Sequence, residues 1–123
     1  MKKIINNAAG KDLSPGYVPV THYMLWEGDK IVGWFRLRHY LSSQLASGAG
    51  HVGYSIREGF RGRGLAASGL GLLIREARKI IPEAELYLRA LRENSPSLKV
   101  MLKNGGYIHH EDELYYYVRI PLN

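Results

Sequence analysis

The sequence predicts a domain of the α+β class, or mixed α/β, built on a single twisted sheet with flanking helices. Short apolar segments with the two-residue alternation of strands lie on both sides of one long stretch with helical periodicity. The strand–helix–strand order in the middle implies a parallel pair with a right-handed crossover, whereas the flanking segments imply antiparallel hairpins. With 123 residues, the chain is expected to form one domain over residues 1–123.

The N-terminal half is predicted to hold an irregular arm followed by three strands. Residues 1–18 are polar and contain glycine and proline, which favours an irregular arm. Residues 21–27 and 31–40 have the composition of strands, and the Gly-Asp pair between them is typical of a hairpin turn. A loop rich in Ser, Ala and Gly over 41–50 then leads into a third strand over 51–56.

The C-terminal half is predicted to hold two helices and two further strands. Apolar residues recur at three- and four-residue steps over 65–80, which indicates a helix with one buried face, and the proline that follows ends it. Residues 85–91 are expected to form a strand. A Ser-Pro pair at 95–96 begins a short helix that the Gly-Gly pair at 105–106 ends, and a Tyr-rich strand follows over 114–120.

Charge and composition limit the kinds of partner and cofactor that we expect for this chain. The chain has 17 basic and 11 acidic residues, a net charge near +6, which favours an anionic partner such as a nucleotide, a nucleic acid or a membrane surface. There is no cysteine, so neither disulfides nor thiol chemistry is expected. The five histidines lack metal-ligand spacing, so we expect no metal. No apolar run approaches a membrane span or a signal peptide, so we expect a cytoplasmic protein with no membrane partner.

The segment 57–67 is the most informative part of the chain. A strand pattern runs into it and a helix pattern runs out of it, and Gly62 and Gly64 permit backbone conformations that a Cβ would forbid. The first amides of a helix lack intrahelical partners, and the helix dipole favours negative charge there. With Arg61 and Arg63 beside the glycines, the turn is predicted to bind a pyrophosphate.

Two familiar glycine motifs fit this turn poorly. A P-loop needs Gly-Lys followed by Ser or Thr, and the turn has no such sequence. The short dinucleotide fingerprint fits Gly62, Gly64 and Ala67, with Glu83 or Glu85 roughly 20 residues further on. The upstream hairpin and the lack of further strand–helix units argue against that interpretation.

A third pattern fits better. Residues 61–66, Arg-Gly-Arg-Gly-Leu-Ala, resemble the Arg/Gln-x-x-Gly-x-Gly/Ala turn of the GNAT N-acetyltransferase superfamily. Residues 94–97 resemble the Asn-x-x-Ser that opens a later helix of that family, and 103–107 resemble its Lys-x-Gly-Phe/Tyr ending. The resemblance covers residues 17–121, and the three motifs in this order make it specific.

The resemblance implies an N-acetyltransferase that moves an acetyl group from acetyl-CoA directly to a primary amine. The turn amides would bind the pyrophosphate, and the strand over 51–56 would splay from the strand over 86–91, so that the pantetheine arm pairs with its free edge. The implied acetyl-CoA contacts are Tyr54, Ser55, Ile56, Arg61, Gly62, Arg63, Gly64, Leu65, Ala66, Asn94 and Ser97.

The catalytic groups are less well defined by the resemblance. Many members of the family carry a tyrosine acid seven residues after the Asn, a position that Met101 occupies here. As the base that removes the amine proton we rank Tyr54 first and His51 second. Acceptor contacts are expected in the loops 41–50 and 108–113.

The N-terminus is the second departure from the family pattern. Too few residues precede Thr21 for the usual N-terminal strand and two helices, so we expect a short or truncated member that lacks them. Its acceptor site would be open or completed by a second subunit, and an incomplete sheet edge favours a homodimer.

Two other functions remain open at this point. The chain could be a degenerate GNAT fold that binds CoA, or a partner protein, without catalysis, which Met101 and the missing N-terminal elements favour. It could also be a small basic nucleic-acid-binding domain that uses tyrosines as stacking platforms, although no RNA-module motif is present. Its phosphate contacts would be Arg36, Arg38, Arg57, Arg61 and Arg63.

Overall fold

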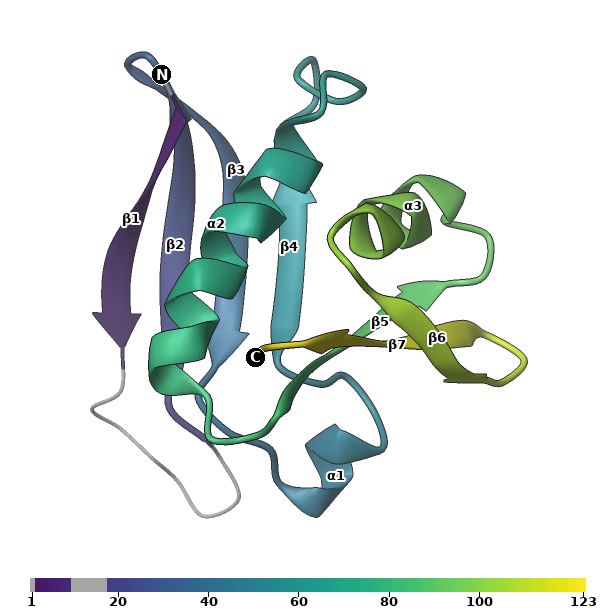
Figure 1. Ribbon diagram of the computed structural model, residues 1–123. Coiled ribbons are helices and arrows are strands. Elements are labelled where there is room, and N and C mark those ends of the chain that lie inside the picture. The colour runs from purple at the N-terminus through teal and green to yellow at the C-terminus, as the bar shows by residue number, and fades with distance from the viewer. Residues whose placement is uncertain (1, 10–17) are drawn as a thin grey trace.

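The computed structural model describes residues 2–9 and 18–123 of the chain (Figure 1). Its elements confirm the mixed α+β class. They are β1 (Lys2–Ala9), β2 (Val20–Glu27), β3 (Lys30–Arg38), α1 (Ser43–Ala46), β4 (Val52–Ile56), α2 (Leu65–Ile80), β5 (Glu85–Leu91), α3 (Ser95–Lys103), β6 (Tyr107–Glu111) and β7 (Tyr115–Pro121).

The strands form two sheets rather than one. β1, β2, β3 and β4 make an antiparallel sheet in that order, and β5, β7 and β6 make a second antiparallel sheet. The parallel pair expected between β4 and β5 is reduced to one end, where the His51 amide donates to the Tyr87 carbonyl at 2.8 Å. Beyond that contact the two strands diverge, as the resemblance implied, and Figure 1 shows the opening between them.

The prediction of an irregular arm over 1–18 is wrong for residues 2–9. These residues form β1, which pairs with β2 from Lys2 opposite Glu27 to Ala9 opposite Val20. Two asparagines interrupt the apolar pattern there, so the strand depends on its partner more than on local propensity. The rest of the expected arm, residues 10–17, lies outside the described residues.

The N-terminal strand expected to be missing is therefore present. The two helices expected to be missing would fall between β1 and β2, where residues 10–17 lie outside the described residues. The edge of β2 on which the expectation of a homodimer rested is covered by β1.

Two elements inside predicted loops were missed. α1 is a single turn within 41–50, begun by the Ser42 hydroxyl, which accepts from the Leu45 amide. β6 occupies most of 108–113, a segment interpreted as loop because every residue of β6 is exposed and no alternation arises. By contrast, the bounds of α2 and β5 are those predicted from the sequence.

α2 covers one face of the four-stranded sheet (Figure 1), and its buried residues Leu65, Leu70, Leu73, Ile74 and Ala77 belong to the hydrophobic core beneath it. A Cβ on Gly69 would lie 2.3 Å from Phe35 Cζ, so the absence of a side chain there lets the helix approach β3 closely. α3 packs instead on β5 and β7. The opposite face of the larger sheet is not covered by any helix of the described residues, and Trp34 on β3 is 47% exposed there.

Candidate functional site

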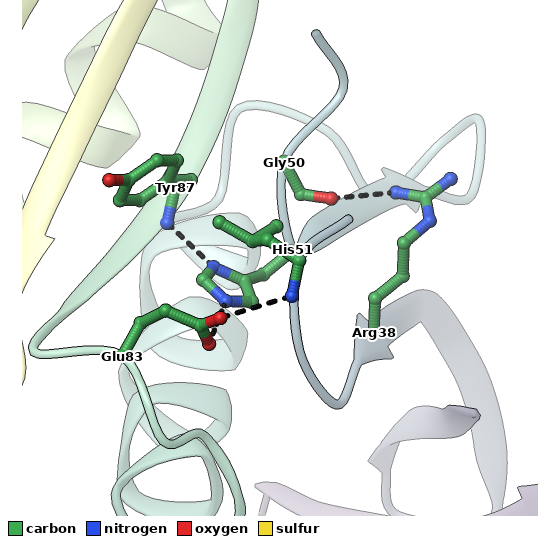
Figure 2. Close-up of polar contacts among 6 residues, drawn as sticks. Arg38, Gly50, His51, Glu83 and Tyr87 are labelled. Carbon is green, nitrogen blue, oxygen red and sulfur yellow. Dashed lines mark hydrogen bonds and ion pairs between the residues drawn. The ribbon is translucent and has the colours of Figure 1, made fainter. Parts of the chain in front are cut away.

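β4 and β5 are joined at one end by a histidine whose two ring nitrogens are both hydrogen-bonded (Figure 2). His51 Nδ1 accepts from the Tyr87 amide at 2.9 Å. The proton must therefore be on Nε2, which donates to Glu83 Oε1 at 3.0 Å. His51 is completely buried, and these two bonds with the backbone contact fix β4 against β5.

The carboxylate that accepts this hydrogen bond has a second donor. Glu83 Oε2 accepts from the Leu41 amide at 3.1 Å. Burial alone would raise the pKa of Glu83, but hydrogen bonds from His51 and Leu41 outweigh it and hold that pKa below its ordinary value. Burial lowers the pKa of His51, and the bond to Glu83 only partly offsets this. The pair at the joined end is a neutral imidazole and a carboxylate.

At the other end of β4 the separation leaves a cavity of about 600 Å³ between the glycine turn and the start of α3. Nearly all the residues predicted to contact acetyl-CoA meet there. The lining includes Tyr54, Ser55, Ile56, Arg61, Gly62, Gly64, Leu65, Ala66, Asn94 and Ser97. Arg63 and His51, which were also singled out in the sequence, do not line it.

The glycine turn presents unused amides to this cavity. Gly62 and Gly64 have φ of 79° and 76°, and Gly64 begins α2 without a side-chain cap. Within the described part of the chain, no protein acceptor meets the amides of residues 62–66. This helix N-terminus therefore offers donors and a favourable dipole to an anion.

The two arginines of the turn behave differently. Arg61 Nε donates to the Ile56 carbonyl at 2.9 Å, which fastens the turn to the end of β4 and keeps a cation beside the free amides. Arg63 instead pairs with Glu27 at 3.0 Å and lies over the Phe60 ring. The Arg63 side chain is 51% exposed and that of Glu27 30%, so water screens the ion pair and the contact is weak.

Tyr54 lies between the sheet and α3. Its ring stacks on Phe35 with centroids 5.4 Å apart, and its hydroxyl is 2.8 Å from Ser97 Oγ. Burial raises the pKa of Tyr54, and the bond with Ser97 offsets part of this. Asn94 caps α3 by accepting from the Ser97 amide, and Met101 is a buried core residue.

Sequence reasoning missed some of these residues. Phe60, Pro96 and Val100 also line the cavity, and only a three-dimensional arrangement brings them there. Glu83 was considered only, with Glu85, as the acidic residue of the dinucleotide fingerprint, whereas it binds His51 across 32 positions of sequence. No local pattern signals a contact of that kind.

Neither a metal cluster nor a membrane-spanning helix is found among the described residues. The described residues hold no group of three or more His, Cys, Asp or Glu side chains arranged to bind a metal. Among the same residues, no helix has the length and apolar character needed to cross a membrane.

The family to which this fold and site belong is established by comparison. The family model described as "Acetyltransferase (GNAT) domain" matches residues 3–106. The chain therefore belongs to the GNAT acetyltransferase family. No curated protein matches the sequence.

Solved structures share the fold. The N-acetyltransferase PseH of Campylobacter jejuni, in complex with acetyl coenzyme A, superposes with a TM-score of 0.68 at 16% identity over 85% of this chain and 69% of that one. The GNAT domain of S. lividans PAT gives 0.69 at 16% identity over 83% and 60%. The ribosomal-protein-S5-alanine acetyltransferase of Vibrio fischeri gives 0.68 at 18% identity over 85% and 62%.

Proposed function

We propose that this protein is an acetyl-CoA-dependent N-acetyltransferase that moves an acetyl group directly to a primary amine. The observation that carries the proposal is the cavity in which unused turn amides and the open edge of β4 face the same space. Membership of the GNAT family and the acetyl coenzyme A complex of a structural neighbour support it.

The two parts of the cavity suit two parts of acetyl-CoA. The pyrophosphate would accept from the amides of residues 62–66, with Arg61 adding positive charge. The pantetheine arm would lie along Tyr54, Ser55 and Ile56, where β4 has no β5 partner, as an added strand does. A main-chain N–H of β4 would then polarise the thioester carbonyl.

Tyr54 is better suited to donate a proton than to accept one. In the reaction the amine nitrogen attacks the carbonyl carbon, the C–N bond forms, the C–S bond breaks and CoA leaves as a thiolate. The amine loses one proton to solvent and the thiolate gains one. Because burial raises the pKa of Tyr54, the phenol holds its proton at neutral pH and can give it to the thiolate.

His51 is better suited to position β4 and β5 than to act as a base. It is fully buried and outside the cavity, and neither ring nitrogen is free to take the amine proton. We infer that it holds β4 and β5 at the distance that keeps the cavity open.

A second candidate function is CoA binding without acetyl transfer. It is favoured by Met101, a buried side chain that cannot donate a proton where many family members have a tyrosine. Transfer to amines distinguishes the two functions, because a binder without catalysis would retain acetyl-CoA and release no free thiol in the presence of a panel of primary amines.

The variant Gly64→Val tests the cavity that both functions require. A Cβ on Gly64 meets no protein atom within 4 Å, so its methyl groups would occupy the space assigned to the pyrophosphate. We expect calorimetry to show acetyl-CoA binding weakened by about a hundredfold. Gly105→Val is the matched control, because Gly105 also has positive φ and open space but lies outside the cavity. Unchanged affinity in Gly64→Val would refute the proposed pyrophosphate site.

A further inference from the structure

A second cavity lies on the face of the larger sheet that α2 leaves uncovered. It measures about 580 Å³ and is lined on that face by His22, Met24, Trp34, Arg36, Gly53 and Ser55. These residues are register partners on β2, β3 and β4, so their side chains leave the sheet on one side. Tyr54 and Ser55 line this cavity and the acetyl-CoA cavity alike, so the two spaces meet across β4.

The chemistry of this second cavity is cationic and aromatic. Its lining contains no Asp or Glu, and Arg36 is in none of the ion pairs or side-chain hydrogen bonds found among the described residues. Trp34, nearly half exposed, supplies an aromatic surface beside it. Arg36 and Arg89 both act electrostatically on Arg38, so positive charge accumulates around this part of the sheet.

Gly53 on β4 leaves room for the Arg36 guanidinium. A Cβ on Gly53 would lie 2.5 Å from Arg36 Nη2 and 3.1 Å from Cζ. The guanidinium thus lies against the β4 backbone in a place that any other residue at position 53 would obstruct. Because it has no hydrogen-bond partner among the described residues, its planar fork is available for a carboxylate, which it can bind through two parallel hydrogen bonds.

We propose that this cavity is the acceptor site and that it selects a primary amine which also carries a carboxylate, bound by Arg36. The amine part of this inference rests on the proposed function, whereas carboxylate binding does not. Two residues of extended strand, about 7 Å, separate Gly53 from Ser55. An ω-amino acid such as 5-aminovalerate can therefore place its carboxylate at Arg36 and its amine where the two cavities meet.

Steady-state kinetics with matched acceptors test the selectivity. 5-Aminovalerate and pentylamine carry similar amines but differ in the carboxylate, and we expect kcat/KM to favour the amino acid by about tenfold. Arg36→Gln should bring the ratio of the two kcat/KM values close to one. Arg75→Gln removes the same charge from an exposed position on α2 and should preserve the ratio. Gly53→Ala, which displaces the guanidinium, should also lower it.

A binding measurement without acetyl-CoA keeps the inference testable if no amine is acetylated. We expect 5-aminovalerate to shift the indole N–H resonance of Trp34 saturably, pentylamine to shift it little, and Arg36→Gln to abolish the shift. The indole of Trp26, which does not line the cavity, is the internal reference. No shift in the wild type, or an equal shift in Arg36→Gln, would overturn the carboxylate site. If the wild-type protein does not bind acetyl-CoA but 5-aminovalerate still shifts the Trp34 resonance, only the proposed function is overturned.

Discussion

Glycines with positive φ lie beyond both ends of β4, but their surroundings differ. At the joined end, Gly50 has φ of +72°, and a Cβ there would lie 2.4 Å from the Tyr87 carbonyl oxygen. At the open end, Gly62 and Gly64 have similar φ values, yet a Cβ on either would meet nothing within 4 Å. The first glycine permits two segments to pack, whereas the other two border empty space.

The polar groups at the two ends differ in whether they have hydrogen-bond partners. At the joined end, His51, Glu83 and the Tyr87 backbone satisfy one another, and the Arg38 guanidinium donates to the Gly50 carbonyl at 3.0 Å (Figure 2). At the open end, the amides that begin α2 have no acceptor among the described residues. Satisfied groups stabilise a fold, and unsatisfied donors beside a cavity are available to a ligand. We therefore expect substitutions at the joined end to affect stability and those at the open end to affect binding.

Gly50→Ala should have the largest effect on stability. The added methyl group must move the Tyr87 backbone, and alanine is also strained at this φ, so we expect a loss of about 3 kcal/mol in the free energy of unfolding. Gly62→Ala carries the same backbone strain without the steric clash and should cost about 1 kcal/mol. Urea unfolding measures both. Equal losses in the two variants would contradict the contrast between the two ends.

The pH dependence of stability should be the next largest effect. Because burial holds the pKa of His51 below its ordinary value of 6.5, the unfolded chain takes up a proton on this side chain before the folded chain does. Its contribution is fully present above pH 6.5 and is lost as the pH falls from 6.5 through the lowered pKa of the folded state. Glu83, with its lowered pKa, adds a further loss below its ordinary value of 4.5.

The variant His51→Gln isolates this contribution. It removes the titrating ring but keeps polar atoms near Tyr87 and Glu83, so the unfolding free energy should be lower and flatter with pH than that of the wild type. Urea unfolding at several pH values makes the comparison. A variant that keeps the wild-type slope between pH 6.5 and 5 would show that His51 is not the source of the slope.

The open end could be predicted from the sequence far better than the joined end. The glycine turn, the start of α2 and the caps of α3 are local features, in which residues a few positions apart determine the backbone. The pairing of His51 with Glu83 joins residues 32 positions apart and leaves no periodic or motif signal. His51 was therefore interpreted as a candidate base, when its surroundings make it part of the fold.

The same distinction explains the errors in secondary structure. α2 was predicted with its bounds because its buried face repeats along sixteen residues. β1 and β6 were missed because each depends on hydrogen bonds to a neighbouring strand, and the fully exposed β6 has no apolar alternation to detect. The cavity around Arg36 was also beyond sequence reasoning, since three strands and their register create it.

Tyr54→Phe should have only a small effect on stability and is the sharpest test of the contrast, because Tyr54 belongs to both the core and the cavity. The ring keeps its stacking on Phe35, and only the bond with Ser97 is lost, so we expect a cost of about 1 kcal/mol. If the phenol supplies the proton to the thiolate, kcat should fall by about a hundredfold while acetyl-CoA affinity changes little. Ser97→Ala is the control, since it removes the same bond but leaves the phenol in place. An undiminished kcat in Tyr54→Phe would mean that the thiolate leaves without this donor, and that the open end binds acetyl-CoA without contributing an acid.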